Sequence, residues 1–548
     1  MIKRHPLAAL AAAVSLLAAA SPAPAQDRPV VDAPAGQVQG TLDGEIRVFK
    51  NLPYAQPPVG PLRWKPPAAP ARWSNLRDAS QFGPACLQPR AAQAGIYTDN
   101  LPQMSEDCLS LNIWTPKDAK AAPVMVWIHG GALSGGGARE AIYDGRRLAE
   151  RGILVVSINY RLGVLGYLAH PGLSAESPLG VSGNYGLLDQ IEALRWVKRN
   201  IAAFGGDPAK VTIAGESAGG LSVMYLMAAP DARGLFAKAI AESAYMISTP
   251  SLTERRFGEI PAEESGLALA AKLHAPDIAA LRAMDAEKLT NAAAMARFAP
   301  FAAVDGHVLP GQLVDVFDRG QQAHVPILAG FNSGEIRSLA ILAPPVPANA
   351  ATYEAIIRSR YGDLADTFLR LYPSSNLHES IFATTRDALY GWTAVRLVKK
   401  QAELGLPSYL YLFDHGYPAA DNAGLHGFHA SELPFVFGTA DRTPAYWPRP
   451  PKTAGEAALS DAMLDYWASF VATGAPKAAG QPDWPAYDTA GAFMAFQDSP
   501  RPWASLMPGM YALHEAVVCR RRAKGDIAWN WNVGIASPPL PPATAACR

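Results

Sequence analysis

The sequence has little that would mark a nucleic-acid-binding or membrane-embedded protein. Its 548 residues contain 48 Lys and Arg against 48 Asp and Glu, so no excess of one charge is available to attract phosphate backbones or an anionic membrane surface. We therefore expect no nucleic-acid partner. After the N-terminal segment, no stretch is long and apolar enough to cross a bilayer, and we expect no membrane span.

Cysteine is scarce, and the four residues fall into two pairs that are close in sequence: Cys86 with Cys108, and Cys519 with Cys547. Their spacings match no Cys/His zinc pattern, and no His-Glu-x-x-His motif occurs, so we expect no metal ion. In an exported protein the simplest interpretation is two disulfides, each closing a short loop. The sequence leaves open whether the second pair forms.

The first 25 residues have the pattern of a secretory signal peptide. Lys3 and Arg4 precede an apolar run over residues 7–20, and the small residues Ala23 and Ala25 flank a proline before Gln26. The alternative is a membrane anchor, but this apolar run is short for a span. We expect cleavage near Ala25 and a secreted or periplasmic mature protein.

A serine between two glycines, straight after a short apolar run, is the most informative stretch of the chain. Residues 211–214 read as a buried strand, residues 221–227 suit a helix, and Ser217 lies on the turn between them. Gly215 and Gly219 complete the spacing G-x-S-x-G, in which a side chain at either glycine would collide with the neighbouring elements. The pattern favours a nucleophile elbow. The alternative is an ordinary serine helix cap, and only the partners of the serine decide between them.

A second glycine-rich loop, residues 129–137, follows the apolar strand 124–128. Such a loop could cradle phosphate, but it lacks the Gly-Lys-Ser/Thr ending and the G-x-G-x-x-G spacing of nucleotide sites. Its His-Gly-Gly start is typical of a loop whose backbone N–H groups face an oxyanion. Strand 153–159, helix 187–204 and strand 211–214 then predict a parallel sheet with crossover helices.

Several segments, in order and spacing, resemble the type-B carboxylesterase/lipase family of the α/β-hydrolase fold, which includes the cholinesterases and bacterial para-nitrobenzyl esterases. They are residues 106–113, 129–132, 159–163, 183–190 and 215–219. The likeness extends from about residue 30 to about residue 515. It implies an α/β fold with a large, mostly parallel central sheet flanked by helices, and helical insertions that form the pocket walls. We expect a hydrolase domain over residues 26–515 and a tail over 516–548 that the second disulfide closes if it forms.

A serine hydroxyl needs a base to attack an ester, and the base needs an acid to orient it. On the fold that the resemblance implies, the order along the chain is serine, acid, histidine. Glu335 follows the predicted strand 325–330 and its context resembles the family's acid. Asp305 is the second candidate, in a Val-Asp-Gly turn that looks structural in relatives.

Two histidines compete as the base, His426 and His429. In the family the base lies three residues before the glutamate of a motif that matches residues 432–438 here, which selects His429. His426 is then expected to line the loop or the pocket.

The resemblance also assigns the groups around the reacting atoms. The backbone N–H groups of Gly131, Ala132 and Ala218 are expected to bind the oxyanion; because the donor is main chain, a methyl group at Ala132 leaves that hydrogen bond available. Glu216, beside the serine, is expected to support the site without reacting. Ser243 is placed like a serine of relatives that holds the acid, although an ordinary helix cap is an equal interpretation.

The predicted function is that of a serine carboxylic ester hydrolase that works through an acyl-enzyme on a small-molecule ester and needs no cofactor. A non-catalytic, cholinesterase-like binding or adhesion protein is the rival from another class. A lipase, amidase or thioesterase would use the same triad. The sequence leaves the substrate open, and also whether the protein is a monomer or a dimer.

The pocket is expected to be shaped by insertions over residues 245–300 and 340–400. Arg337 and Arg386 are candidates to bind an anionic acyl group, by proximity only. The other candidates to line the pocket are Tyr245, Phe298, Phe301, His426 and Phe428.

Overall fold

The computed structural model describes residues 28–90, 95–97 and 101–547. The predicted signal peptide, residues 1–25, therefore lies outside the described residues. Both predicted disulfides are formed, Cys86 with Cys108 and Cys519 with Cys547.

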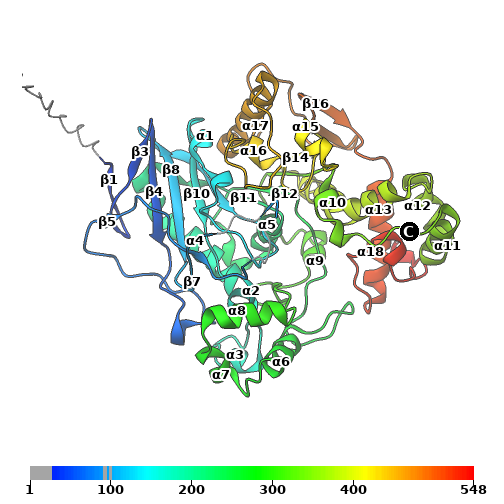
Figure 1. Cartoon of the computed structure of the whole chain (residues 1–548), viewed down its shortest axis with the longest axis horizontal. Coiled ribbons are helices and arrows are strands. Elements are labelled where there is room, and N and C mark those ends of the chain that lie inside the picture. Colours follow the sequence, from blue (N-terminus) through cyan, green and yellow to red (C-terminus); the bar gives the residue numbers. More distant parts are fainter. Residues whose placement is uncertain (1–27, 91–94, 98–100, 548) are drawn as a thin grey trace, which may run out of the picture.

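A large mixed sheet runs through the middle of the molecule (Figure 1). Within the described residues it has eleven strands in the order β16-β15-β14-β13-β12-β11-β9-β10-β8-β4-β3. Neighbouring strands are parallel from β15 through β14, β13, β12, β11 and β9 to β10. The pairs beyond them, toward both edges of the sheet, are antiparallel. This is the α/β-hydrolase arrangement that the sequence predicts. The strands are β3 (Thr41–Asp43), β4 (Ile46–Pro53), β8 (Ser110–Pro116), β9 (Ala122–Ile128), β10 (Leu154–Ile158), β11 (Gly206–Glu216), β12 (Lys238–Glu242), β13 (Ile327–Asn332), β14 (Ser408–Phe413), β15 (Ala492–Phe496) and β16 (Pro500–Ala504).

The central strands are apolar along their length because helices cover both faces of the sheet. Every residue of β10, β12 and β13 is buried. One face packs on α4 (Tyr185–Asn200), α5 (Ala218–Ala228), α9 (Leu313–Asp318) and α14 (Trp392–Ala402). The other packs on α1 (Arg146–Ala149), α16 (Leu433–Val436) and α17 (Ala454–Thr473).

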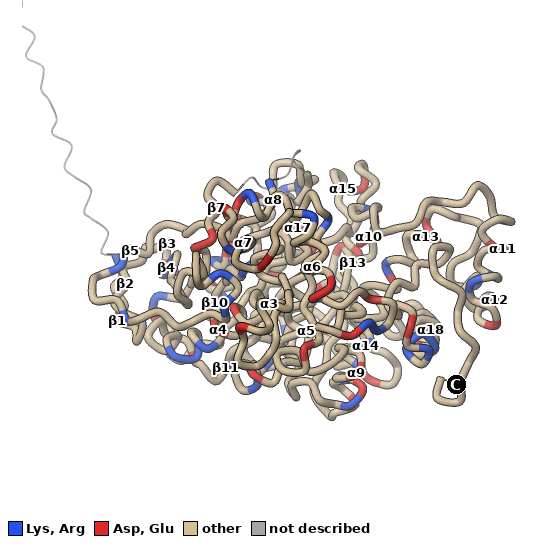
Figure 2. Tube along the Cα trace, turned by 90° about the horizontal axis from the view of Figure 1, so that it is seen from below, with Lys and Arg blue, Asp and Glu red and all other residues tan. Residues whose placement is uncertain are grey.

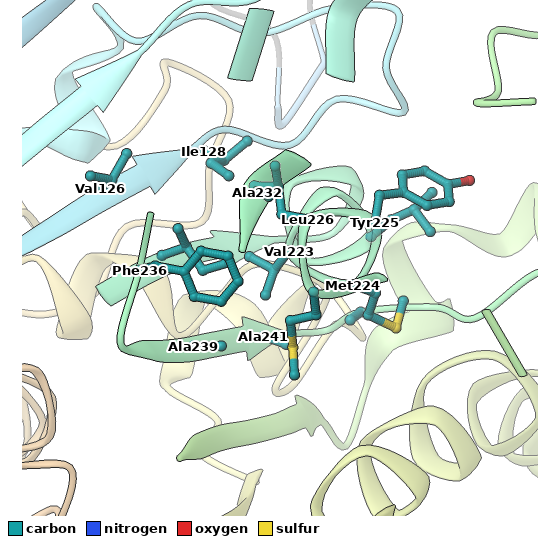
Figure 3. Packing of buried hydrophobic residues seen from close by; sticks show 14 of the residues in the cluster. Val126, Ile128, Val223, Met224, Tyr225, Leu226, Ala232, Phe236, Ala239 and Ala241 are labelled. Atoms are coloured by element: carbon teal, nitrogen blue, oxygen red, sulfur yellow. The ribbon is translucent and has the colours of Figure 1, made fainter. Parts of the chain in front are cut away.

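Helix α5 is buried on all sides, which explains why its sequence shows no polar face. Figure 3 shows Val223, Met224 and Leu226 of α5 among Val126 and Ile128 of β9 and Ala239 and Ala241 of β12. This tight contact fixes the start of α5 relative to the carboxyl ends of the strands, where ligands bind in open α/β sheets.

Two helical insertions lie outside the sheet, as the sequence predicts. The first contains α6 (Ala262–Lys272), α7 (Ile278–Ala283) and α8 (Ala286–Met295), and shares a separate core with α2 (Gly163–Tyr167) and α3 (Pro171–Ala175) (Figure 1). The second contains α11 (Ala350–Tyr361), α12 (Ala365–Leu371) and α13 (Leu377–Arg386). It is joined to α14 by a π-helical turn, η7 (Asp387–Gly391).

Helix α18 (Met510–Lys524) packs with α11 and α12 at the end of the molecule that carries the C-terminal residues (Figure 1). We call α11, α12, α13 and α18 the C-terminal lobe. The predicted boundary between residues 515 and 516 falls inside α18, because this helix continues without a break on both sides of it. The predicted tail therefore begins as part of a packed helix.

The smaller elements complete the fold. They are β1 (Val30–Ala33), β2 (Gly36–Gln39), β5 (Arg77–Asp78), β6 (Ala85–Cys86), β7 (Met104–Ser105), α10 (Glu335–Ser338) and α15 (Pro418–Asn422). Lys and Arg alternate with Asp and Glu over the chain, as its balanced charge predicts (Figure 2). Among the described residues, no helix is both long and apolar enough to span a bilayer.

Candidate active site

The turn that carries Ser217 joins β11 to α5 and has the geometry of a nucleophile elbow. Ser217 adopts φ +56°, a strained value for a residue with a side chain, and its N–H donates to the Glu242 carbonyl at 3.0 Å. A Cβ atom on Gly219 would lie 2.0 Å from the Ile128 carbonyl oxygen of the neighbouring strand β9. Only glycine fits there, which is the steric reason that the sequence pattern suggested.

The loop after β9 runs beside this elbow. Gly131 adopts φ +103°, and a Cβ atom there would lie 2.3 Å from the Gly135 carbonyl oxygen. Within the described part of the chain, the N–H groups of Gly131, Ala132 and Ala218 donate to no other group. Ala218 is the first residue of α5, so its N–H also lies at the positive end of the helix dipole. These three N–H groups are available to a developing negative charge.

Two loops at the carboxyl ends of β13 and β14 are joined by hydrogen bonds. The Gly334 N–H donates to the Gly427 carbonyl at 2.7 Å, and the Asn332 side-chain amide donates to the Phe428 carbonyl at 2.8 Å. Glu335 begins α10 on the first loop and His429 lies on the second. The two loops therefore bring together an acid and an imidazole that are 94 residues apart in sequence.

Glu335 is fully buried, and both of its carboxylate oxygens have partners. Oε1 accepts the Asn332 backbone N–H at 2.8 Å, and Oε2 accepts a short hydrogen bond from His429 Nδ1. Because Nδ1 carries the proton of this bond, Nε2 is the nitrogen of the neutral ring that can accept another proton.

His429 Nε2 faces a second carboxylate. It lies 3.1 Å from Oε1 of Glu216, the residue before the predicted nucleophile. The Ser217 hydroxyl itself has no hydrogen-bond partner among the described residues. Catalytic hydrogen bonds of free enzymes are often long or misaligned and tighten when substrate binds.

The two carboxylates set the protonation of the histidine. Burial by itself lowers the pKa of His429, but the negative charges of Glu216 and Glu335 and the hydrogen bond to Glu335 outweigh it and raise the pKa to about 9. Burial also raises the pKa of Glu216, which the charge of His429 partly offsets, to about 7. The two carboxylates therefore favour the imidazolium form of His429.

Comparisons with known proteins identify the family of this chain. A family model described as the carboxylesterase family matches residues 27–509. The chain belongs to the carboxylesterase family. This carboxylesterase is 37% identical over 480 residues to the fumonisin B1 esterase of Sphingopyxis macrogoltabida, a match that covers 84% of the chain and 85% of that relative.

Two further matches agree. The para-nitrobenzyl esterase of Bacillus subtilis (strain 168) is 36% identical over 466 residues, covering 82% of this carboxylesterase and 91% of the relative. A solved structure of PNB esterase superposes with a TM-score of 0.77 at 33% identity, covering 89% of this chain and 99% of that one. Both the α/β-hydrolase fold and the ester-hydrolysing activity of the family therefore apply to this protein.

Three other predicted residues of the carboxylesterase make no hydrogen bond to Ser217, Glu335 or His429 in the described structure. The Ser243 hydroxyl is buried without a hydrogen-bond partner in the described structure, so the expected contact to Glu335 is not formed; the Asn332 backbone N–H takes that place. His426 is 42% exposed, with Nδ1 2.8 Å from an Asp421 oxygen. Asp305 accepts the Asn184 side-chain amide at 2.9 Å in a structural turn.

The predicted pocket residues have other partners. Arg337 pairs with Glu379 at 2.7 Å. Arg386 bonds Asp387 at 2.7 Å. Phe428 is completely buried and its ring packs against a tryptophan ring in the core at 4.9 Å. The expectation that Phe428 lines a pocket is therefore wrong.

Sequence reasoning missed three residues around His429. The Tyr97 hydroxyl donates to the His429 carbonyl at 2.9 Å, and the Tyr390 ring lies 5.4 Å from the imidazole. No pattern in the sequence points to either tyrosine. Glu432 accepts a short hydrogen bond from the Asn332 amide. The sequence did hold a signal for Glu432, because it lies three residues after His429 in the motif that selected the base.

Among the described residues, no group of three or more His, Cys, Asp or Glu side chains is arranged to hold a metal ion.

Proposed function

We propose that Ser217 is the nucleophile of this carboxylesterase, His429 its general base and acid, and Glu335 the carboxylate that orients the histidine. The observation that carries the proposal is the hydrogen bond from His429 Nδ1 to buried Glu335. The other ring nitrogen of His429 lies beside Glu216, the residue before Ser217. This bond fixes the tautomer in which Nε2 can take a proton.

The reaction has two acyl-transfer steps. Ser217 Oγ attacks the ester carbonyl carbon while His429 Nε2 takes the hydroxyl proton, and the carbonyl oxygen becomes an oxyanion bound by the N–H groups of Gly131, Ala132 and Ala218. The histidine then gives its proton to the leaving alcohol. Water attacks the acyl-enzyme in the same way and regenerates the serine.

Glu216 has a distinct part in this scheme. With Nε2 next to Glu216, the free enzyme holds His429 as imidazolium. The base becomes active when it loses that proton and Nε2 turns to the adjacent Ser217 hydroxyl. Hydrolysis should therefore be faster in alkaline than in neutral solution.

The substrate we propose is a small-molecule carboxylic ester. The relatives named fumonisin B1 esterase and para-nitrobenzyl esterase support this class. Neither Arg337 nor Arg386 presents a free guanidinium for an anionic acyl group, because each is already paired with a carboxylate. These contacts count against Arg337 and Arg386 as the groups that bind an anionic acyl chain.

An organophosphonate that carries a reporter group tests the proposal. The wild-type enzyme should be labelled on Ser217, as shown by peptide mass spectrometry, and should lose activity in proportion. The Ser217→Ala variant should take up no label. Labelling of another residue, or full inhibition without a Ser217 adduct, would refute the assignment.

We further propose that the protein is exported, with residues 1–25 removed as a signal peptide. Its two disulfides support an oxidising compartment. N-terminal sequencing of the protein from the native host should begin near Gln26. A mature protein that retains residues 1–25 would contradict this.

A further inference from the structure

A row of buried polar side chains crosses the C-terminal lobe. It begins at Asn532, beyond α18, and passes through His514 of α18 and Tyr372 after α12 to Asp387 at the start of η7. All four side chains are buried. Polar groups in such a place remain stable only when they are hydrogen-bonded, so the order of their donors and acceptors matters.

The donor and the acceptor of each hydrogen bond in this row can be assigned. The Asn532 side-chain amide donates to His514 Nδ1 at 2.7 Å, which leaves the ring proton on Nε2. His514 Nε2 then donates to the Tyr372 oxygen at 2.9 Å, and the Tyr372 hydroxyl donates to Asp387 Oδ2 at 2.9 Å. A neutral imidazole is required, and burial provides it by lowering the pKa of His514 to about 4.

The row continues to the loop that carries Glu335. Arg386 Nε donates to Asp387 Oδ1 at 2.7 Å, and Arg386 Nη1 donates to the Ser333 carbonyl at 3.0 Å. Ser333 lies two residues before Glu335. A charged, two-sided contact of this kind holds a loop more firmly than a single neutral hydrogen bond does.

The same row also reaches the histidine from another side. Asp387 is the first residue of the π-helical turn η7, and Tyr390 of that turn lies 5.4 Å from the His429 ring, in a tilted arrangement. π-Helical turns inside helices occur frequently at functional sites. Displacement of Asp387 would therefore disturb both members of the acid–histidine pair.

The far end of the row is held by the C-terminal residues. The Tyr361 hydroxyl bonds Asn532 Oδ1 at 2.5 Å and Ser537 Oγ at 3.1 Å. The disulfide of Cys519 and Cys547 ties the end of the chain to α18. All residues from Met510 onward lie beyond the region that the family model matches, residues 27–509.

We propose that Tyr372, Asp387 and Arg386 are positioning residues for the Glu335–His429 pair, and that the C-terminal segment 530–537 completes their support through His514. The inference rests on the proposed roles of Ser217, His429 and Glu335. It gives the tail, for which the sequence suggests no role, a part in ester hydrolysis.

The first test removes one oxygen atom, with Tyr372→Phe. This change takes the partner from both His514 and Asp387. We expect kcat for an activated ester to fall on the order of tenfold, less than the ~10²-fold that a 1 Å misplacement costs. KM should stay unchanged. The rise of kcat/KM with pH should move to lower pH, because a displaced Glu335 stabilises the imidazolium of His429 less.

Tyr353→Phe is the matched control. Tyr353 is fully buried in the same lobe, and its hydroxyl donates at 2.9 Å to the backbone carbonyl of Tyr372 and to none of the four side chains that form the row. It should cost similar stability and leave kcat and the pH profile as in the wild type. Equal losses of kcat in the two variants would mean general loosening of the lobe and would overturn the proposal.

A pair of variants at His514 tests the direction of the bonds. Gln has one acceptor and one donor group and can replace both bonds of the ring, whereas Leu can make neither. We expect His514→Gln to keep kcat within about twofold of the wild type, while His514→Leu loses as much as Tyr372→Phe. If His514→Gln and His514→Leu behave alike, the row does not position the site.

Phosphonate labelling separates this inference from the proposed function. If Ser217 of the wild-type enzyme takes no label, the catalytic assignment fails and the inference falls with it. Both the wild type and Tyr372→Phe could instead be labelled. If the variant then also hydrolyses ester at the wild-type rate and with the wild-type pH profile, only the positioning proposal fails. Should Tyr372→Phe not fold, as judged by near-UV circular dichroism, the His514 pair decides.

Discussion

The two halves of the proposed active site are held in place in different ways. The elbow and the oxyanion loop lie within a few residues of β11 and β9, and backbone packing fixes them, since a Cβ atom on Gly219 or Gly131 would overlap a carbonyl oxygen. Glu335 and His429 lie on loops 94 residues apart and are joined by side-chain and loop hydrogen bonds. The first half is rigid by steric exclusion, whereas the second depends on a network in which each bond can be removed separately.

The largest effect is expected on the rigid half. Ser217→Ala removes the attacking oxygen while leaving the elbow intact, and kcat/KM for an activated ester should fall roughly 10⁶-fold. Stopped-flow or long-incubation assays on the purified variant measure the residual rate. Activity within a hundredfold of the wild type would mean that another residue is the nucleophile.

Glu335→Gln tests the networked half. The amide can keep a contact to the ring but carries no charge to stabilise the imidazolium and can favour the wrong tautomer, so we expect kcat to fall about 10⁴-fold. Steady-state kinetics across pH and a thermal melt separate lost chemistry from lost folding. A modest change in kcat would show that Glu335 is not the carboxylate that orients His429.

Glu216→Gln tests how the two halves meet. The negative charges of Glu216 and Glu335 together raise the pKa of His429 to about 9, so removing one of them lowers it. The alkaline rise of kcat/KM should then shift to lower pH by about one unit, and the rate at neutral pH should increase relative to the plateau. A profile that keeps the wild-type midpoint would show that Glu216 does not control the base.

The smallest effect is expected at the histidine that competes in the sequence. His426 is largely at the surface, paired with Asp414 and Asp421, so His426→Ala should change kcat by less than about twofold. His429→Ala, assayed beside it, should remove nearly all turnover. The reverse result would show that the base was assigned in the wrong register.

These two halves also differ in how far the sequence predicted them. The elbow was predictable because its constraint is local: two glycines at a fixed spacing around a serine, after an apolar run, suit few local structures besides a sharp strand-to-helix turn. His429 could be chosen over His426 only through the resemblance, since both lie on one loop. The parallel sheet and the helical insertions followed from successive apolar runs. Both disulfides join cysteines that are close in sequence, although the sequence left the second pair open.

The contacts that sequence reasoning missed are long-range side-chain contacts. Tyr97 reaches the carbonyl of His429 from a loop without a motif, 332 residues away, and nothing in its neighbourhood encodes that partner. Ser243 was expected to bond Glu335 by analogy, but its hydroxyl is buried without a partner, and Glu335 accepts the Asn332 backbone N–H instead. Phe428 is buried in the core, although it lies next to His429 in the sequence.

The π-helical turn between α13 and α14 has a consequence for insertions and deletions. Successive residues of an α-helix are rotated by about 100° about the helix axis. The one extra residue of a π-helical turn therefore changes which side chains of α14 share a face with those of α13, compared with a continuous α-helix. On α13 that face carries Arg386, and on α14 it carries Arg396, bound to Glu515 of α18 at 2.6 Å. Loss of a single residue here would swing Tyr390 away from the imidazole or unseat α14, so the enzyme has to preserve the length of this segment as well as its residues.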